Sequence, residues 1–431
     1  MTLLIISPDY ASHLLPLATL GTAWRDAGER VVVATGPATA SIVEGFGFER
    51  VNLQLGKGSN PGIIRAEDQP TGEDEALRGF FDATRRGMVE TLAYQAEARL
   101  SDLMWEPVRV AREVQAVVAA VGPDSIIVDH LAFSARLGLD AAGVSYADVV
   151  LGHPSALPVG DEVYGYPPAW PAAFTPSETE LAALHDLCVR VSESFTAEWN
   201  AALAELAPHL PASPSAFEEH GELLLLNYPG ELSPAARTAQ LPPHEFLGSA
   251  VRDEPADAEV DAWLASSDEP FVYVSFGSFL SVRTDVLARV ARAAENLGLR
   301  VALATGSGID LPELPHHWLV RPFLPQVTLL KRAAAAVTHG GNNSVTEAMT
   351  FGVPLVVLPF STDQFAGAAA IEESGWGVAL APNTATVDEL AAALADVRGR
   401  TRAPLAASLQ ADPGRDRAYR AVTEPGRRST D

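Results

Sequence analysis

Short apolar runs alternate with stretches of helical periodicity along the first half of the chain. The run 3–6 ends at a Ser-Pro-Asp turn, a helix is predicted over 14–27, and the next strand follows at 30–36. Further strands are predicted over 123–129 and 222–229, each around a continuous apolar run. Strands that alternate with helices are typical of a parallel, doubly wound sheet.

The same alternation begins again in the second half. A strand is predicted over 269–278, a helix over 284–297, and further strands over 300–305 and 354–359. The sequence therefore predicts an α/β protein with two Rossmann-like, doubly wound domains. Because open sheets of this kind bind ligands at the carboxyl ends of their strands, we expect the two domains to face a common cleft.

Composition suggests where the domains begin and end. An N-terminal domain is expected over 1–230, followed by a linker over 231–268 that is rich in Pro, Asp, Glu and Ala. The second domain is expected over 269–396, and a basic tail with a weak helical pattern over 397–431.

Charge and cysteine content exclude several classes of protein. The chain has 431 residues, 47% of them hydrophobic, and a formal net charge of −25, which disfavours nucleic acid and anionic membranes as partners. Cys188 is the single cysteine, so no disulfide framework is expected. The sequence shows no signal-peptide pattern and no long uncharged apolar stretch, which predicts a cytoplasmic protein.

The most informative chemistry lies between residues 323 and 364. Thr338 is expected to end a strand, and a helix is expected to begin at Asn342. Gly340 and Gly341 between them allow the backbone to approach a ligand closely. Exposed N–H groups at such a helix start bind anions, and His339 can donate a hydrogen bond or a charge to the same anion. The segment thus predicts a diphosphate site, although an ordinary helix N-cap has the same residue types.

The complete stretch resembles the nucleotide-sugar signature of the family 1 glycosyltransferases, which include bacterial antibiotic glycosyltransferases. The similarity rests on Phe-Leu-Pro-Gln at 323–326, His-Gly-Gly-Asn-Asn-Ser at 339–344, Glu347, Gly-Val-Pro at 352–354 and Asp-Gln at 363–364. It implies the two-domain GT-B fold and a nucleotide diphosphate sugar, linked to UDP or dTDP, as co-substrate.

The resemblance also implies roles for individual residues. Phe323 would stack on the base, Glu347 would bind the ribose hydroxyls, and Asp363 would bind the donor sugar. Asn342 stands where plant members have Trp, so sugar preference is not carried over from them. The implied donor-binding set is Ser275, Gly277, Ser278, Phe323, Gln326, His339, Gly341, Asn342, Asn343, Ser344, Glu347, Asp363 and Gln364.

A second similarity to the family lies in the first domain. Ser-His-Leu-Leu-Pro at 12–16 resembles the family's Gly-His-x-x-Pro, which implies that His13 is the general base. The ordinary pKa of histidine suits this role at neutral pH. Asp129, at the end of a predicted strand, resembles the carboxylate that the family pairs with this histidine. Asp9 is a rival partner for His13, and His130 is an alternative to Asp129.

The acceptor side is less clearly marked. His153, Tyr164 and Trp170 lie in a loop region rich in Pro, Gly and aromatic residues, where they either line the acceptor site or pack the loop. Similarity to antibiotic glycosyltransferases suggests a small natural-product acceptor, such as a macrolide, polyketide, peptide or nucleoside.

The expected reaction inverts the configuration at the sugar. His13 would take the proton of an acceptor hydroxyl while the diphosphate leaves from the opposite face. The chain has no Asp-x-Asp triplet and its ten His are scattered, so neither a metal nor a cofactor is expected. The expected state is a monomer or homodimer. A nucleotide-sugar epimerase lacks the 323–364 pattern, and a non-catalytic glycosyltransferase-like helper remains the alternative.

Overall fold

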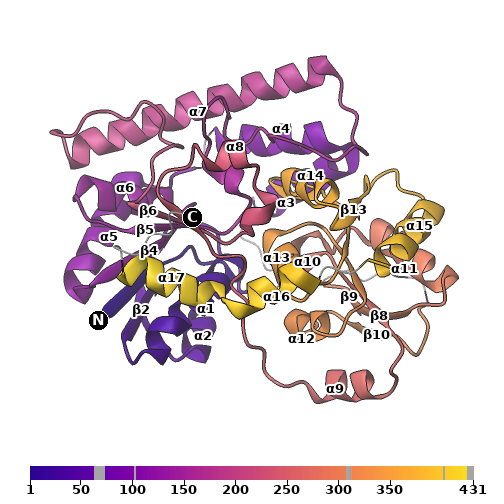
Figure 1. Ribbon diagram of the computed structural model, residues 1–431. Helices are drawn as coiled ribbons and strands as arrows, with labels where there is room; N and C mark the ends of the chain where they lie inside the picture. The colour runs from indigo at the N-terminus through magenta and orange to yellow at the C-terminus, as the bar shows by residue number, and fades with distance from the viewer. Residues whose placement is uncertain (63–72, 101–102, 307–310, 312, 401–402, 425–431) are drawn as a thin grey trace.

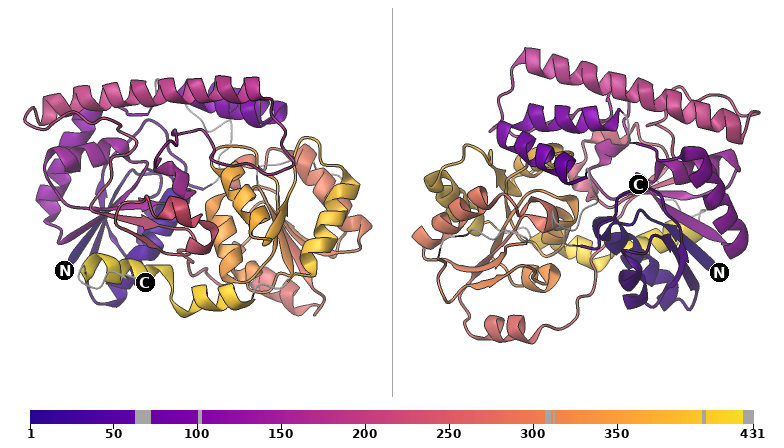
Figure 2. Two further views of the ribbon diagram at one scale, coloured as in Figure 1. Left: turned by 45° about the horizontal axis from the view of Figure 1, so that its top comes forward. Right: turned by 180° about the vertical axis from the view of Figure 1, so that it is seen from behind.

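Two α/β domains lie side by side in the computed structural model, and each is built around a parallel sheet (Figures 1 and 2). The structure describes residues 1–62, 73–100, 103–306, 311, 313–400 and 403–424. This architecture confirms the predicted α/β class with two doubly wound domains.

The first sheet has seven strands in the order β3-β2-β1-β4-β5-β6-β7. Its strand order turns back between β1 and β4, the neighbouring strands at its centre. The strands are β1 (Thr2–Ile6), β2 (Arg30–Thr35), β3 (Glu49–Asn52), β4 (Ser125–Asp129), β5 (Ala147–Val150), β6 (Leu223–Leu226) and β7 (His244–Phe246). The helices of this part are α1 (Ala11–Asp26), α2 (Ala40–Gly45), α3 (Glu73–Arg86), α4 (Met88–Arg99), α5 (Pro107–Val121), α6 (Phe133–Ala141), α7 (Glu178–Leu206) and α8 (Ala235–Thr238), with short 3-10 turns at Pro154–Ala156 and Gly230–Leu232.

The second sheet has six strands in the order β10-β9-β8-β11-β12-β13, and it turns back between β8 and β11. The strands are β8 (Phe271–Ser275), β9 (Arg300–Ala304), β10 (Leu319–Arg321), β11 (Ala335–Thr338), β12 (Leu355–Val357) and β13 (Gly377–Ala379). The remaining helices are α9 (Ala258–Ala265), α10 (Gly277–Leu280), α11 (Thr284–Asn296), α12 (Gln326–Leu330), α13 (Asn342–Thr350), α14 (Gln364–Glu373), α15 (Val387–Arg398), α16 (Ala403–Ala411) and α17 (Gly414–Thr423).

The segment 231–268, expected to be a linker, contributes to both domains. Its strand β7 pairs with β6 and extends the first sheet, so this sheet continues beyond residue 230. Its helix α9 packs on the second domain through Val260 and Leu264, which belong to a cluster with Phe271. A three-residue, half-buried strand such as β7 has too short a pattern to be recognised in the sequence.

The tail after residue 396 is more ordered than its weak helical pattern suggested. α16 packs near α13 of the second domain, and α17 lies against α1 of the first (Figures 1 and 2). The Tyr419 ring meets that of Trp24 edge-on at 5.1 Å, and its hydroxyl donates to Glu29 at 2.9 Å. The tail therefore joins the two domains, and tertiary contacts stabilise a helix that is weak on its own.

Candidate functional site

One cavity of 630 Å³ is lined by residues of both domains. Each domain contributes the carboxyl ends of the two strands at which its strand order turns back: β1 and β4 in the first sheet, β8 and β11 in the second. Such positions leave a crevice above the sheet, because successive helices lie on opposite faces. The predicted cleft is therefore present, and the fold explains its position.

His13 and Asp129 meet in this crevice, brought together by the pairing of β1 with β4. His13 lies in the first turn of α1, which begins before the predicted helix, and Asp129 is the last residue of β4. The His13 Nδ1 atom lies 2.7 Å from Asp129 Oδ2, and the Leu131 N–H donates to Oδ1 at 2.9 Å. Because the carboxylate accepts a hydrogen bond from Nδ1–H, Nε2 keeps the lone pair that a general base needs. The His13 side chain is 28% exposed, whereas that of Asp129 is 1% exposed.

Two opposing effects set the pKa of His13. Burial lowers it, because the charged imidazolium is less well solvated. The charge of Asp129, its hydrogen bond and the charge of Asp363 outweigh burial, so the pKa of His13 is raised above its ordinary value of 6.5.

The two rival residues have other hydrogen-bond partners. The Asp9 carboxylate accepts hydrogen bonds from the N–H groups of Ala38 and Thr39, and so holds the loop after β2. The His130 ring is buried, with Nδ1 3.0 Å from Asp148 Oδ2. Neither side chain is bonded to His13.

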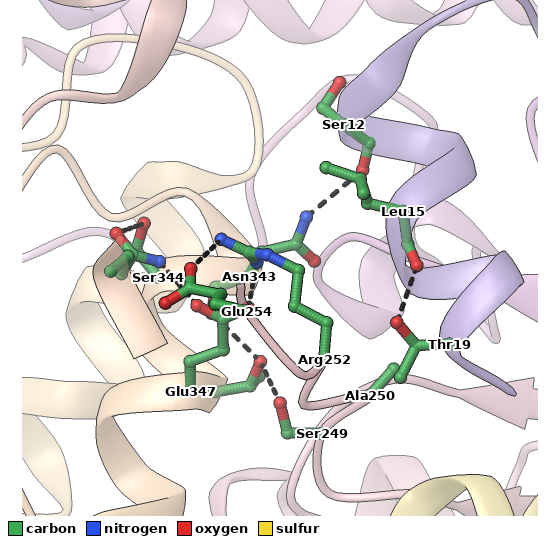
Figure 3. Close-up of polar contacts among 12 residues, drawn as sticks. Ser12, Leu15, Thr19, Ser249, Ala250, Arg252, Glu254, Asn343, Ser344 and Glu347 are labelled. Carbon is green, nitrogen blue, oxygen red and sulfur yellow. Dashed lines mark hydrogen bonds and ion pairs between the residues drawn. The ribbon is translucent and has the colours of Figure 1, made fainter. Parts of the chain in front are cut away.

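A hydrogen bond made possible by a proline joins the helix of His13 to the second domain. Pro16 lies inside α1 and has no N–H, so the carbonyl of Ser12 lacks its usual partner four residues on. The side-chain amide of Asn343, in the first turn of α13, donates to this carbonyl at 3.1 Å (Figure 3). The Ser12 carbonyl that Pro16 leaves unpaired within α1 thus accepts a hydrogen bond from Asn343, a residue of the predicted donor site.

Two glycines shape the loop before α13. Gly340 has a φ of +86°, and Gly341 precedes the helix at its N-cap. A Cβ on Gly341 would lie 2.4 Å from His339 Nε2, so the glycine leaves room for the ring. No acidic residue occupies the first turn of α13, so the positive end of its dipole is not neutralised there.

His339 faces this helix start as a neutral ring. Burial lowers the pKa of His339 to about 4, despite the opposing charge of Asp363. Its Nδ1 atom is buried and has no hydrogen-bond partner among the described residues. His339 is therefore neutral at neutral pH, which favours a hydrogen bond over a charge.

Several predicted donor residues hold the domains together in this structure. The Asn342 amide donates to the carbonyls of Leu151 and Asn227 at 2.7 and 2.8 Å. Asp363 Oδ2 accepts the His153 N–H at 2.7 Å. These contacts cross from the second domain to the first, so the residues predicted to bind the donor also join the two domains.

Arg252 is a site residue that the sequence reasoning missed. It follows β7 in the segment between the domains, lines the cavity and donates to Glu347 Oε1 at 2.6 Å and to Glu254 Oε1 at 2.9 Å (Figure 3). Gln326 donates to Glu347 Oε2 at 2.6 Å. Burial raises the pKa of Glu347, and the positive charge of Arg252 opposes this shift. No sequence motif surrounds Arg252, so only the fold reveals the contact.

Most predicted site residues line the cavity. Among them, the Phe323 residue is 60% exposed, so its ring is open to a ligand. The lining members are His13, Asp129, Tyr164, Ser275, Gly277, Phe323, Gln326, His339, Gly341, Asn342, Asn343, Ser344 and Asp363.

Four predicted residues are not in the lining. Glu347 is buried behind Arg252, and the Gln364 amide oxygen accepts from the N–H groups of Phe360 and Ser361. The His153 ring bonds to Ser155, and Trp170 packs on the hydrophobic cluster around α7, as the packing alternative required. The side chain of Ser278 lies outside the described residues.

Within the described ranges, no group of three or more His, Cys, Asp or Glu side chains is arranged to hold a metal ion. Among the helices of the same residues, none is long and apolar enough to cross a membrane.

Comparisons with known proteins agree with this geometry. Residues 192–400 match the sequence model of the family described as UDP-glucoronosyl and UDP-glucosyl transferase. The NDP-glycosyltransferase YjiC of Bacillus subtilis is 32% identical over 126 residues, 28% of this chain and 32% of the relative. The 4'-demethylrebeccamycin synthase of Lentzea aerocolonigenes is 31% identical over 163 residues, 37% of each chain. The chain spans 25–40% of the length of the first curated relatives that it matches.

Solved structures share the fold over nearly the complete chain. The spinosyn forosaminyltransferase SpnP has a TM-score of 0.66 at 18% identity, with 98% of both chains covered. The glycosyltransferase VinC, solved in complex with dTDP, has a TM-score of 0.62 at 19% identity, with 98% of this chain and 96% of that one covered.

The fold and the cavity define a two-domain GT-B protein whose cleft joins the switch points of both sheets. Residues 192–400 are similar to the UDP-glucuronosyl and UDP-glucosyl transferases, in agreement with the resemblance to family 1 glycosyltransferases that the sequence motifs carry.

Proposed function

We propose that the protein is an inverting, metal-independent glycosyltransferase that moves a hexose from a nucleotide diphosphate sugar to a hydroxyl of a small natural product. The observation on which this rests most is that one cavity contains both the His13–Asp129 pair and the α13 helix start. The first domain would bind the acceptor, and the second the donor. The similarity to the 4'-demethylrebeccamycin synthase supports an acceptor of this class.

In the proposed reaction His13 Nε2 takes the proton of the acceptor hydroxyl as its oxygen attacks the anomeric carbon. The carbon–oxygen bond to the diphosphate breaks on the opposite face, so an α-linked donor gives a β-linked product. Asp129 holds the Nδ1–H and stabilises the imidazolium that forms.

The departing diphosphate gains negative charge, which the second domain is arranged to accept. N–H groups at the start of α13 and the neutral His339 ring offer hydrogen bonds to it. Phe323 offers a face to the base, whether uracil or thymine. Ribose contact with Glu347 requires Arg252 to move or to take part itself, since Arg252 stands between Glu347 and the cavity.

The direct test incubates the purified protein with UDP- or dTDP-linked sugars and an acceptor panel. We expect release of nucleoside diphosphate, a product heavier by one hexose in mass spectrometry, and an unchanged rate in excess EDTA. NMR of the product should show a β-linkage. Tight nucleotide binding without any turnover across the panel would instead indicate the non-catalytic helper.

The pH dependence of the reaction follows from the raised pKa of His13. The base must be neutral, so kcat/KM should be flat above this pKa and fall tenfold per unit below it, with the midpoint above 6.5. Asp129→Asn removes the charge that opposes burial, so the midpoint should move to lower pH. Rates between about pH 5 and pH 9 measure both midpoints. If the midpoint did not move in Asp129→Asn, the fall in kcat/KM at low pH would belong to a group other than His13.

A further inference from the structure

Arg99, the last residue of α4, projects into the cavity from the first domain. Its guanidinium carbon lies 5.3 Å from the centroid of the Tyr164 ring, within the range of a cation–π contact. A Cβ on Gly165 would lie 3.2 Å from Arg99 Nη1, so the guanidinium is packed against this loop. The side chain is therefore half-buried and held in place.

Unlike the other arginine in the lining, Arg99 has no anionic partner among the residues that the structure describes. The described lining contains Arg99 and Arg252 and no lysine. Arg252 is paired with Glu254 and Glu347, whereas no hydrogen bond or ion pair joins Arg99 to any other described residue. A positive side chain at the C-terminal end of α4 is stabilised by the helix dipole. This explains why a cation occurs at position 99 but not why its guanidinium lines the cavity.

The surfaces around Arg99 are apolar and aromatic. Tyr164, Tyr166 and Pro167 also line the cavity, and they belong to the loop on which the guanidinium packs. A guanidinium beside such walls is partly desolvated, so a bound carboxylate would form a stronger ion pair with it than at an open surface.

We propose that Arg99 selects acceptors that carry a carboxylate on a largely apolar or aromatic body. The inference rests on the proposed glycosyl transfer and names the acceptor class for the same cavity. The diphosphate is not the expected partner of Arg99. The neighbours of Arg99 are Tyr164 and Gly165 of the first domain, whereas the α13 start contacts Leu151, Asn227 and Ser12.

The test compares a hydroxynaphthoic acid with its methyl ester, a pair that differs in the carboxylate charge. We expect the natural chain to prefer the acid. Arg99→Leu should lower kcat/KM for the acid by about 10- to 100-fold, mainly through KM, and leave the ester unchanged. Arg99→Lys should keep part of the preference, because it retains the charge but loses the planar fork. Arg112→Leu, at an exposed arginine outside the cavity, is the matched control and should change neither substrate.

Three results would overturn the proposal. They are an equal loss of kcat/KM for acid and ester in Arg99→Leu, a wild-type protein that prefers the ester, and an effect of Arg99→Leu on the donor KM alone. A natural chain that transfers sugar to neither compound would contradict the proposed function instead. In that case calorimetric binding of acid and ester to the natural chain and to Arg99→Leu still decides the role of Arg99. If the wild-type protein binds the acid more tightly than the ester and Arg99→Leu does not, the proposed role of Arg99 is supported. Equal binding of acid and ester to the wild-type protein refutes it.

Discussion

His13→Ala is expected to reduce kcat by about 10²- to 10⁴-fold, the usual contribution of a positioned general base. The His13 ring is held by Asp129 at 2.7 Å, and no second described histidine in the lining has this arrangement with its free nitrogen available. His130 also lines the cavity, but its two ring nitrogens lie 3.0 Å from Asp148 and 3.2 Å from the Ala156 carbonyl.

The measurement separates chemistry from donor binding. Because the donor is expected on the second domain, its dissociation constant should change little in His13→Ala, while the rate of nucleoside diphosphate release falls. His209→Ala, at an exposed histidine outside the cavity, is the matched control and should retain the natural rate. Normal transfer by His13→Ala would refute the assigned mechanism.

Asp148→Asn is expected to destabilise the protein by about 3–5 kcal/mol. Asp148 and Arg136 are both 0% exposed, and Arg136 Nε lies 3.2 Å from Asp148 Oδ2. Removing the carboxylate charge leaves the guanidinium buried without its anion, and burial of an unpaired charge is costly. The nearby His130 ring loses the same partner.

Equilibrium urea unfolding at neutral pH measures this loss. Glu205→Gln breaks the exposed pair with Arg112 and serves as the surface control, with an expected change below about 1 kcal/mol. Combining Asp148→Asn with Arg136→Met removes both charges and should recover much of the stability. Equal effects of Asp148→Asn and the surface control would show that the buried pair is not required.

The donor side of the site was largely predictable because its residues are close in the sequence. Gly340, Gly341 and Asn342 follow one another between a strand and a helix, and a helix start is an anion site wherever it occurs. Local order along the chain was enough to predict their common place. The pairing of His13 with Asp129 was implied by the resemblance to the family, with Asp9 and His130 left as alternatives, and the contact itself depends on the pairing of β1 with β4.

Other contacts depend on distant parts of the chain and were not predictable. Arg252 meets Glu347 across 95 residues. The Ser12 carbonyl meets Asn343 across 331 residues. The first contact changes how Glu347 must act, and the second gives Asn343 a role between the domains. Neither leaves a periodic or compositional pattern, because each depends on how the two domains are oriented.

The sequence by itself determined the two α/β domains, the family signature and the residue types that the chemistry needs. These features follow from local periodicity and from short motifs. Only the tertiary structure decided that β7 extends the first sheet, that α17 packs on α1, that the Gln364 amide oxygen is bonded to backbone, and that Arg99 lines the cavity with no carboxylate partner among the described residues. The physical reason is that burial and ion pairing depend on which surfaces meet, and in this fold those surfaces come from distant parts of the chain.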